Sequence, residues 1–96
     1  MAIIVTRHVA LVDYLIEEGV VPKGCKVLSH ASKKEVMGQD VIGVLPMHLA
    51  ALASSITEVP LKIPSDLRGK ELTVKEVRKY AEPPVTYVVT IIKEKV

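Results

Sequence analysis

The sequence predicts an α/β fold, a compact three-layer structure built on one mostly parallel β-sheet. Three observations predict it. Short apolar runs rich in valine and isoleucine alternate with segments of helical periodicity, which is typical of parallel strands joined by crossover helices. The apolar residues are aliphatic, with no Phe, no Trp and three Tyr, which suits packed layers of sheet and helix. The length of 96 residues fits one domain, so we expect residues 1–96 to fold as a unit.

The first half of the chain predicts a strand, a helix and a second strand. Residues 2–5 are a β-branched run that is typical of a buried strand. Residues 8–18 carry apolar side chains at helical spacing, and Gly19 follows where a helix commonly ends. Residues 26–29 predict a short strand. The polar residues 31–40 predict a turn of helix or a loop.

The middle of the chain predicts another strand, helix and strand. Residues 41–45 are apolar throughout and predict a buried strand. Pro46 suits the first position of a helix, which we expect to reach about Ile56. Residues 58–63 alternate in polarity and predict a strand, although Pro60 favours an edge or irregular position for it.

The last third of the chain predicts a helix and a final strand. Thr73 and Glu76 have the spacing of a capping box, so a helix should begin between them. Pro83 and Pro84 end that helix. Residues 85–92 predict a long last strand, which could lie antiparallel at the edge of the sheet.

Composition excludes several classes of function. The net charge of +2 is too small for a protein that coats long nucleic acids, and the scarcity of aromatic residues counts against stacking on single strands. The longest apolar stretch, residues 41–53, is too short to cross a membrane. Cys25 is the only cysteine, which excludes an internal disulfide. With no pattern typical of a secretory leader, we expect a cytoplasmic protein.

The best candidate for chemistry is the run Thr6-Arg7-His8 at the end of the first predicted strand. Ligands of open α/β sheets bind at such strand-to-helix junctions. A hydroxyl, a permanent cation and an imidazole suit an anionic, phosphorylated ligand there. The alternative is that Arg7 is a surface cation and His8 a first-turn residue of the helix.

A second junction of the same kind follows the strand at residues 41–45 and contains Pro46, Met47 and His48. In a parallel sheet it lies at the same edge as His8, where the start of a helix favours an anion. His48 could equally be an exposed polar residue. Ser29 and His30 also end a predicted strand at this edge, so they should line the rim of the pocket.

Other chemistries lack their signatures. No Cys, His or Asp cluster has the spacing of metal ligands, and no glycine-rich phosphate loop is present, so we expect neither a metal nor another cofactor. Histidine phosphatases begin with Arg-His-Gly, but Val9 follows His8 here and the chain is too short for that fold. The loop containing Arg68 could be solvated or could add a cation to the pocket.

Three short motifs in a fixed order carry a family resemblance. They are Val5-Thr6-Arg7-His8, the run from Val41 to Ala51, and Leu67-Arg68-Gly69-Lys70-Glu71-Leu72. In these motifs the chain resembles a small CRISPR-associated accessory family of the Csx type, found with type III systems. The resemblance implies a dimeric, Rossmann-like domain related to those that sense cyclic oligoadenylates.

The implied activity is that of a ring nuclease, which opens cyclic tetra-adenylate without a metal and so ends the antiviral signal. By resemblance, the pocket residues are Thr6, Arg7, His8, Pro46, Met47, His48 and Arg68. For the chemistry, we expect Arg7 to stabilise charge on the phosphate and His8 to move a proton or orient the attacking 2′-hydroxyl. Two alternatives remain: a module of the same fold that binds a cyclic nucleotide without cutting it, and an unrelated α/β interaction domain.

Overall fold

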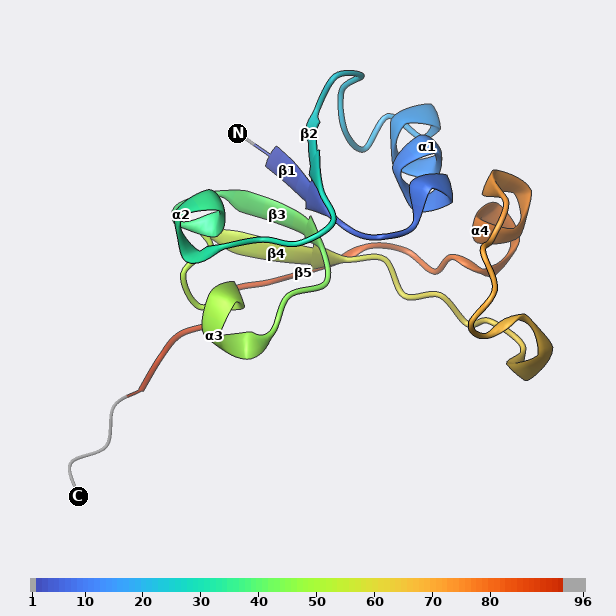
Figure 1. Ribbon diagram of the computed structural model, residues 1–96. Coiled ribbons are helices and arrows are strands. Elements are labelled where there is room, and N and C mark those ends of the chain that lie inside the picture. Colours follow the sequence, from blue (N-terminus) through green and yellow to red (C-terminus); the bar gives the residue numbers. More distant parts are fainter. Residues whose placement is uncertain (1, 93–96) are drawn as a thin grey trace.

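The computed structural model describes residues 2–92, which form a five-stranded sheet flanked by short helices (Figure 1). The elements, in chain order, are β1 (Ala2–Val5), α1 (Val9–Glu17), β2 (Lys26–Leu28), α2 (Lys33–Val36), β3 (Asp40–Gly43), α3 (Met47–Ala50), β4 (Ser55–Glu58), the 3-10 helix η1 (Ser65–Leu67), α4 (Val74–Tyr80) and β5 (Val85–Tyr87). None of the helices within residues 2–92 is long and apolar enough to span a membrane.

The strands lie in the order β2-β1-β3-β4-β5. Neighbouring strands from β2 to β4 pair in parallel, and β5 pairs antiparallel with β4 at the edge. This topology confirms the predicted mostly parallel, Rossmann-like sheet and its antiparallel last strand. The carboxyl ends of β2, β1 and β3 therefore meet at one edge of the sheet. The strand order reverses between β1 and β3, which is where open α/β sheets bind ligands.

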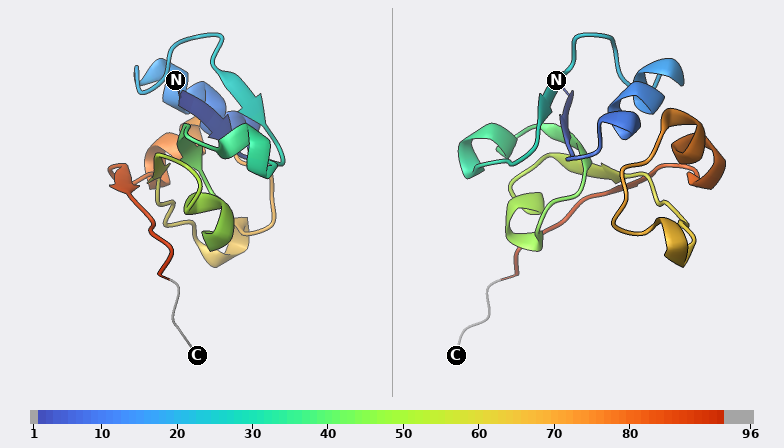
Figure 2. Two further views of the ribbon diagram at one scale, coloured as in Figure 1. Left: turned by 90° about the vertical axis from the view of Figure 1, so that its left-hand side faces the viewer. Right: turned by 45° about the vertical axis from the view of Figure 1, so that its right-hand side comes forward.

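Helices cover both faces of the sheet, which confirms the three layers (Figures 1 and 2). On one face, Ile4 and Ile42 belong to a buried cluster with the side chains of α1 and α4. On the other, Ile3 and Val41 pack in a second cluster with residues of α2 and α3. Successive strand residues face opposite layers because side chains alternate along a strand.

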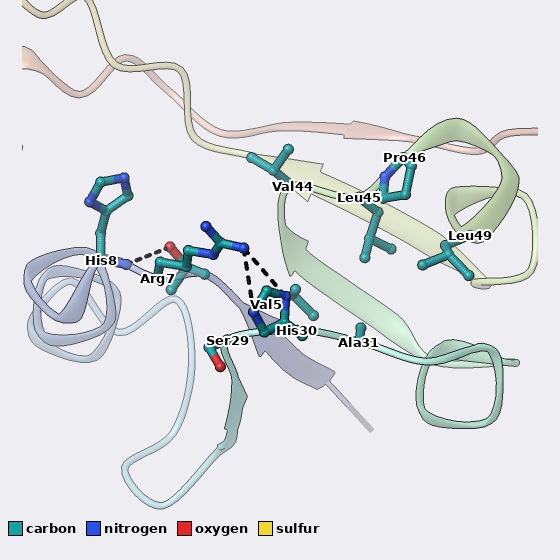
Figure 3. Close-up of a pocket in the computed structure, with 11 residues that line it drawn as sticks. Val5, Arg7, His8, Ser29, His30, Ala31, Val44, Leu45, Pro46 and Leu49 are labelled. Atoms are coloured by element: carbon teal, nitrogen blue, oxygen red, sulfur yellow. Dashed lines mark hydrogen bonds between the residues drawn. The ribbon is translucent and has the colours of Figure 1, made fainter. Parts of the chain in front are cut away.

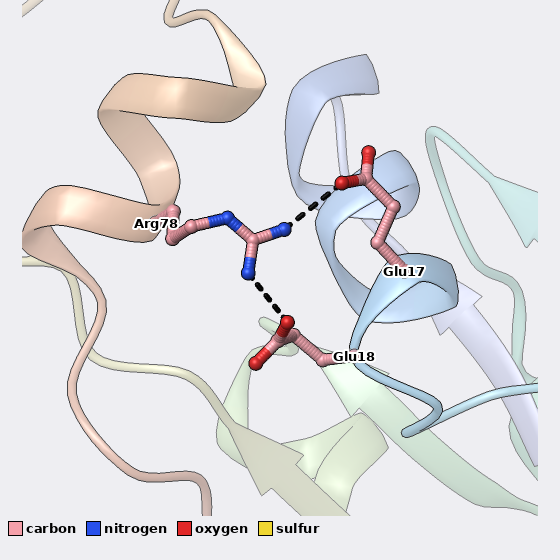
Figure 4. A network of polar contacts seen from close by, with 3 residues as sticks. All are labelled: Glu17, Glu18 and Arg78. Carbon is pink, nitrogen blue, oxygen red and sulfur yellow. Dashed lines mark hydrogen bonds and ion pairs between the residues drawn. The ribbon is translucent and has the colours of Figure 1, made fainter.

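A charged network joins the two helices of the first face (Figure 4). The guanidinium of Arg78 on α4 donates hydrogen bonds to the carboxylates of Glu18 and Glu17 at the end of α1, the latter at 2.9 Å. Its hydrogen bond to Glu18, with the charges of both glutamates, raises the pKa of Arg78. The guanidinium also lies over the ring of Tyr14, 5.3 Å from its centroid. These contacts are exposed, so they fix the helix pairing more than they add stability.

The helix predicted from Pro46 to Ile56 is wrong in length, because α3 ends at Ala50. Two serines explain the difference. The Ser54 N–H donates to the Gln39 carbonyl at 2.8 Å, and the Ser55 hydroxyl donates to the Asp40 carboxylate at 2.9 Å. These bonds tie residues 54–55 to the start of β3.

The strand that follows is displaced for the same reason. Because residues 54–55 are held beside β3, the chain enters β4 at Ser55, with Ile56 paired to Val41, rather than at the predicted residues 58–63. Part of that predicted segment survives as an isolated bridge between Leu61 and Ala81.

Two strands end earlier than predicted. β3 ends at Gly43 rather than at residue 45, because Gly43 has a φ of 136° and leaves the extended conformation. β5 covers Val85–Tyr87 rather than residues 85–92, because it pairs only with Glu58 to Ile56 of β4. The ambiguous polar segment contains a true helical turn, α2. The predicted capping box of Thr73 and Glu76 at the start of α4 is confirmed.

Candidate functional site

A hollow of about 450 Å³ opens where the carboxyl ends of β1, β2 and β3 meet (Figure 3). We refer to it as the first hollow. Six of the predicted site residues line it, and segments that follow all three strands contribute to it. The lining residues are Val5, Thr6, Arg7, His8, Ser29, His30, Ala31, Val44, Leu45, Pro46 and Leu49. Its volume lies in the lower part of the range of ligand pockets, about 300–1,000 Å³.

The central polar contact of the first hollow joins Arg7 to His30 (Figure 3). The Nη2 atom of Arg7 lies 3.4 Å from Nδ1 and 3.3 Å from Nε2 of the imidazole. A neutral imidazole accepts a hydrogen bond at only one nitrogen, and here Arg7 reaches that nitrogen in either tautomer. The contact therefore directs the guanidinium of Arg7 to His30.

The turn after β1 is held by its own threonine. The Thr6 N–H donates to the Leu28 carbonyl at 2.9 Å, and the Thr6 hydroxyl oxygen accepts from the His8 N–H at 3.1 Å. His8 is the N-cap of α1, yet its side chain makes no capping hydrogen bond. Its exposed ring is directed away from the pair of Arg7 and His30 (Figure 3). The imidazole of His8 is therefore available to a ligand.

Between β1 and β3 the backbones approach unusually closely. The Val44 N–H donates to the Val5 carbonyl at 3.3 Å. A Cβ atom at Gly43 would lie 1.9 Å from that carbonyl oxygen, a distance that no side chain can occupy. Glycine at this position therefore lets the chain turn directly from β3 into the wall of the first hollow.

The wall opposite the polar rim is apolar, and Pro46 is the residue of it that was predicted as part of the site. Leu45, Pro46 and Leu49 lie together on this side, whereas Ala31 follows His30 (Figure 3). Leu45 and Leu49 flank the predicted strand-to-helix junction at Pro46, and this position is the signal that could have indicated them. Within the described residues, the lining contains no carboxylate. The first hollow therefore suits a flat, uncharged group bonded to an anion.

The remaining predicted residues lie elsewhere. Met47 and His48 are exposed on α3 and are not among the residues that line the first hollow. The start of α3 offers little to an anion, because this helix has only four residues. Arg68 lines a neighbouring hollow, which shares Arg7 and His8 with the first one. The structure thus brings together the predicted strand-end cluster and leaves Met47 and His48, which were predicted with it, outside the first hollow.

Comparison with protein families gives one match. The family model described as "Putative CRISPR-associated protein (Cas_VVA1548)" matches residues 3–90. The chain belongs to this family. That result confirms the expected relation to CRISPR-associated accessory proteins. Comparisons with curated proteins and with solved structures found no significant match.

The site of this Cas_VVA1548 protein is built from the matched part of the chain, since every residue that lines the first hollow lies within residues 3–90. Among residues 2–92, no three side chains of His, Cys, Asp or Glu come together in a way that could hold a metal ion. The polar groups of the site are thus an arginine, two imidazoles and two hydroxyls, which are donors suited to phosphate oxygens.

Proposed function

We propose that this protein is a metal-independent ring nuclease that opens cyclic tetra-adenylate, acts in the cytoplasm and ends type III CRISPR signalling. One observation carries the proposal: Arg7 faces a carboxylate-free, half-apolar hollow at the switch point of a parallel sheet. An adenine fits the apolar wall, and the phosphate beside it meets the guanidinium. Membership of a CRISPR-associated family supports the choice of ligand.

The reaction needs little from the protein beyond positioning and charge. A ribose 2′-oxygen forms a bond to the neighbouring phosphorus, the bond from phosphorus to the 5′-oxygen breaks, and a 2′,3′-cyclic phosphate remains. The 2′-hydroxyl loses its proton and the 5′-oxygen gains one. Arg7 stabilises the negative charge that builds on the phosphate oxygens. His8 moves a proton or orients the 2′-hydroxyl.

The ligand also suggests a dimer. A ring of four nucleotides is larger than one hollow of about 450 Å³, and it has a twofold axis. Two copies of the chain related by a twofold axis would present the same hollow to both halves of the ring.

The test is an incubation of the purified protein with cyclic tetra-adenylate in excess EDTA, followed by chromatography of the products. We expect linear products that end in a 2′,3′-cyclic phosphate. The Arg7→Ala variant should cut at least about a hundredfold more slowly, because it removes the group that stabilises the charged transition state. Lys33→Ala, which removes an exposed cation on α2, is the matched control and should cut at the wild-type rate.

Activity that disappears in EDTA and returns with a divalent metal would contradict the proposed mechanism. An Arg7→Ala variant with the full rate would contradict the role of Arg7.

A second candidate function is binding without cleavage. One observation favours it: the ring of His8 is directed away from Arg7, so the two groups do not converge on one phosphate in the unliganded protein (Figure 3). Such a module would sequester the cyclic nucleotide. The same assay separates the two functions, because a sequestering protein binds the ring and leaves it intact.

A further inference from the structure

A second hollow, of about 360 Å³, adjoins the first one. It is lined by Arg7 and His8 together with Ile63 and residues 67–72, which belong to the segment around and after η1. Because Arg7 and His8 line both hollows, the two meet at the turn that follows β1.

The two shared side chains serve different sides of this turn. The guanidinium of Arg7 is directed to His30, in the first hollow. The ring of His8 is directed away from that contact, and no capping bond holds it (Figure 3). A group bound over the turn would therefore have Arg7 on one side and His8 on the other.

The second hollow has the same chemical character as the first one. Leu72 is buried beneath it, and Ile63 and Leu67 are half-buried. Arg68 and Lys70 are exposed cations at its rim, against the single carboxylate of Glu71. An apolar floor with an excess of cations suits a second nucleoside and the phosphate that follows it.

We propose that the two hollows hold consecutive nucleotides of one strand, with the phosphodiester that links them lying over Thr6, Arg7 and His8. This inference rests on the proposed function for the identity of the ligand. It makes Arg68 and Lys70 the binding residues for the phosphate on the far side of the second nucleotide.

The arrangement also assigns the proton donor. In-line displacement requires the attacking and leaving oxygens on opposite sides of the phosphorus. The 2′-hydroxyl of the nucleotide in the first hollow attacks, and its proton passes to solvent. The leaving 5′-oxygen belongs to the nucleotide in the second hollow, beside His8, whose protonated ring gives it a proton.

The test compares two ligands that cannot be cut, because their attacking hydroxyl is methylated. One is 2′-O-methyladenosine 3′-phosphate, which fills the first hollow and reaches Arg7. The other is the same nucleotide extended by adenosine 3′-phosphate, which fills both hollows. By titration calorimetry, we expect the wild-type protein to bind the dinucleotide at least about tenfold more tightly.

Substitutions at the rim of the second hollow should affect one ligand only. Arg68→Ala and Lys70→Ala should each weaken dinucleotide binding by about fivefold to tenfold and leave mononucleotide binding within twofold. Lys75→Ala, which removes an exposed cation on α4, should change neither affinity. All three side chains are exposed, so the variants should fold.

Equal wild-type affinities for the two ligands would overturn the inference, as would rim substitutions that weaken both ligands alike or neither. If the protein cuts the cyclic ring but shows no preference for the dinucleotide, the proposed function stands and the role of the second hollow in nucleotide binding is contradicted. If the protein prefers the dinucleotide through Arg68 and Lys70 yet never cuts the ring, the role of the second hollow stands and the proposed nuclease activity is contradicted.

Discussion

Gly43 is the residue on which the shape of the site most depends. It has a φ of 136°, and its α-carbon faces the Val5 carbonyl so closely that a Cβ would lie 1.9 Å from the oxygen. Any side chain must therefore push β1 and β3 apart. Because the first hollow lies between the ends of these strands, the displacement would reach Arg7 and its surroundings.

We predict that Gly43→Ala destabilises the protein by at least about 2 kcal/mol, from backbone strain and the clash together, and lowers the melting temperature by about 10 °C. Circular dichroism during heating measures this. Gly24→Ala is the matched control, since Gly24 also has a positive φ of 90° but nothing within 4 Å of the added carbon. This variant should be destabilised only by the backbone strain, by about 1 kcal/mol. Equal losses at the two positions would show that the contact with Val5 is unimportant.

At the level of single residues, the sequence predicts membership of the site better than it predicts contacts. Thr6, Arg7, Ser29 and His30 were expected at one edge because each follows a strand, and strand order then brings them together. The bond between Arg7 and His30 was not expected. These residues are 23 positions apart, and their contact depends on side-chain torsions that no local pattern encodes.

The helical turn α2 shows how a short element depends on its cap. The Ser32 N–H donates to the Glu35 carboxylate at 2.9 Å, and the Ser32 hydroxyl accepts from the Glu35 N–H at 3.4 Å. The turn carries Val36, which is fully buried against β1 and β3. The backbone hydrogen bond from Ser32, followed by the bond to its side chain, lowers the pKa of Glu35 below its ordinary value of 4.5.

This lowered pKa predicts a dependence of stability on pH. Because the folded state holds Glu35 ionised more firmly than the unfolded state does, its contribution is fully present above about pH 4.5 and is lost as the pH falls through the lower, folded-state pKa. We expect the melting temperature of Glu35→Gln to fall less than that of the wild type between neutral pH and about pH 3. Parallel pH profiles for the two proteins would contradict this role. Ser32→Ala keeps the Glu35 carboxylate and removes the Ser32 hydroxyl, so it tests the hydrogen bond from the Glu35 N–H.

The predicted element boundaries are wrong where long-range hydrogen bonds compete with local periodicity. The apolar spacing from Leu49 to Ile56 favours a continuous helix. Ser54 and Ser55 instead bond to Gln39, Gly38 and Asp40, and the chain enters β4 early. By contrast, the beginning of α4 was predicted within one residue, because its capping box lies next to the helix in the sequence.

On the scale of the whole molecule, the edge of the sheet at β5 is unprotected. Residues 85–92 contain no charged residue and no proline, the features that usually keep edge strands from pairing with other chains. Five of their large apolar side chains are exposed, namely Val85, Tyr87, Val88, Ile91 and Ile92. We expect a second copy of the chain to cover this surface, because antiparallel pairing of an edge strand with its own copy is self-complementary about a twofold axis. This pairing turns the carboxyl ends of the two β1 strands in opposite directions, so it is a separate assembly from the dimer proposed to hold one ring.

Sedimentation equilibrium should accordingly give twice the chain mass of 10.5 kDa. Val88→Glu should shift the protein to monomer, because it places a charge within the apolar surface. Val27→Glu alters an exposed apolar side chain on β2, at the opposite edge of the sheet, and should leave the dimer intact. A wild-type monomer, or a Val88→Glu dimer of undiminished affinity, would contradict this interface.

The pairing of α1 with α4 has a consequence for synthesis. Leu11 and Leu15 of α1 are covered in part by Leu72 and Val77, which come from the last third of the chain. While the ribosome is still translating the middle of the message, the part of the apolar side of α1 that packs on Leu72 and Val77 is uncovered. The protein can therefore complete its fold only when translation is nearly over. A product that stops short of Leu72 would expose apolar surface of the kind that chaperones and proteases recognise.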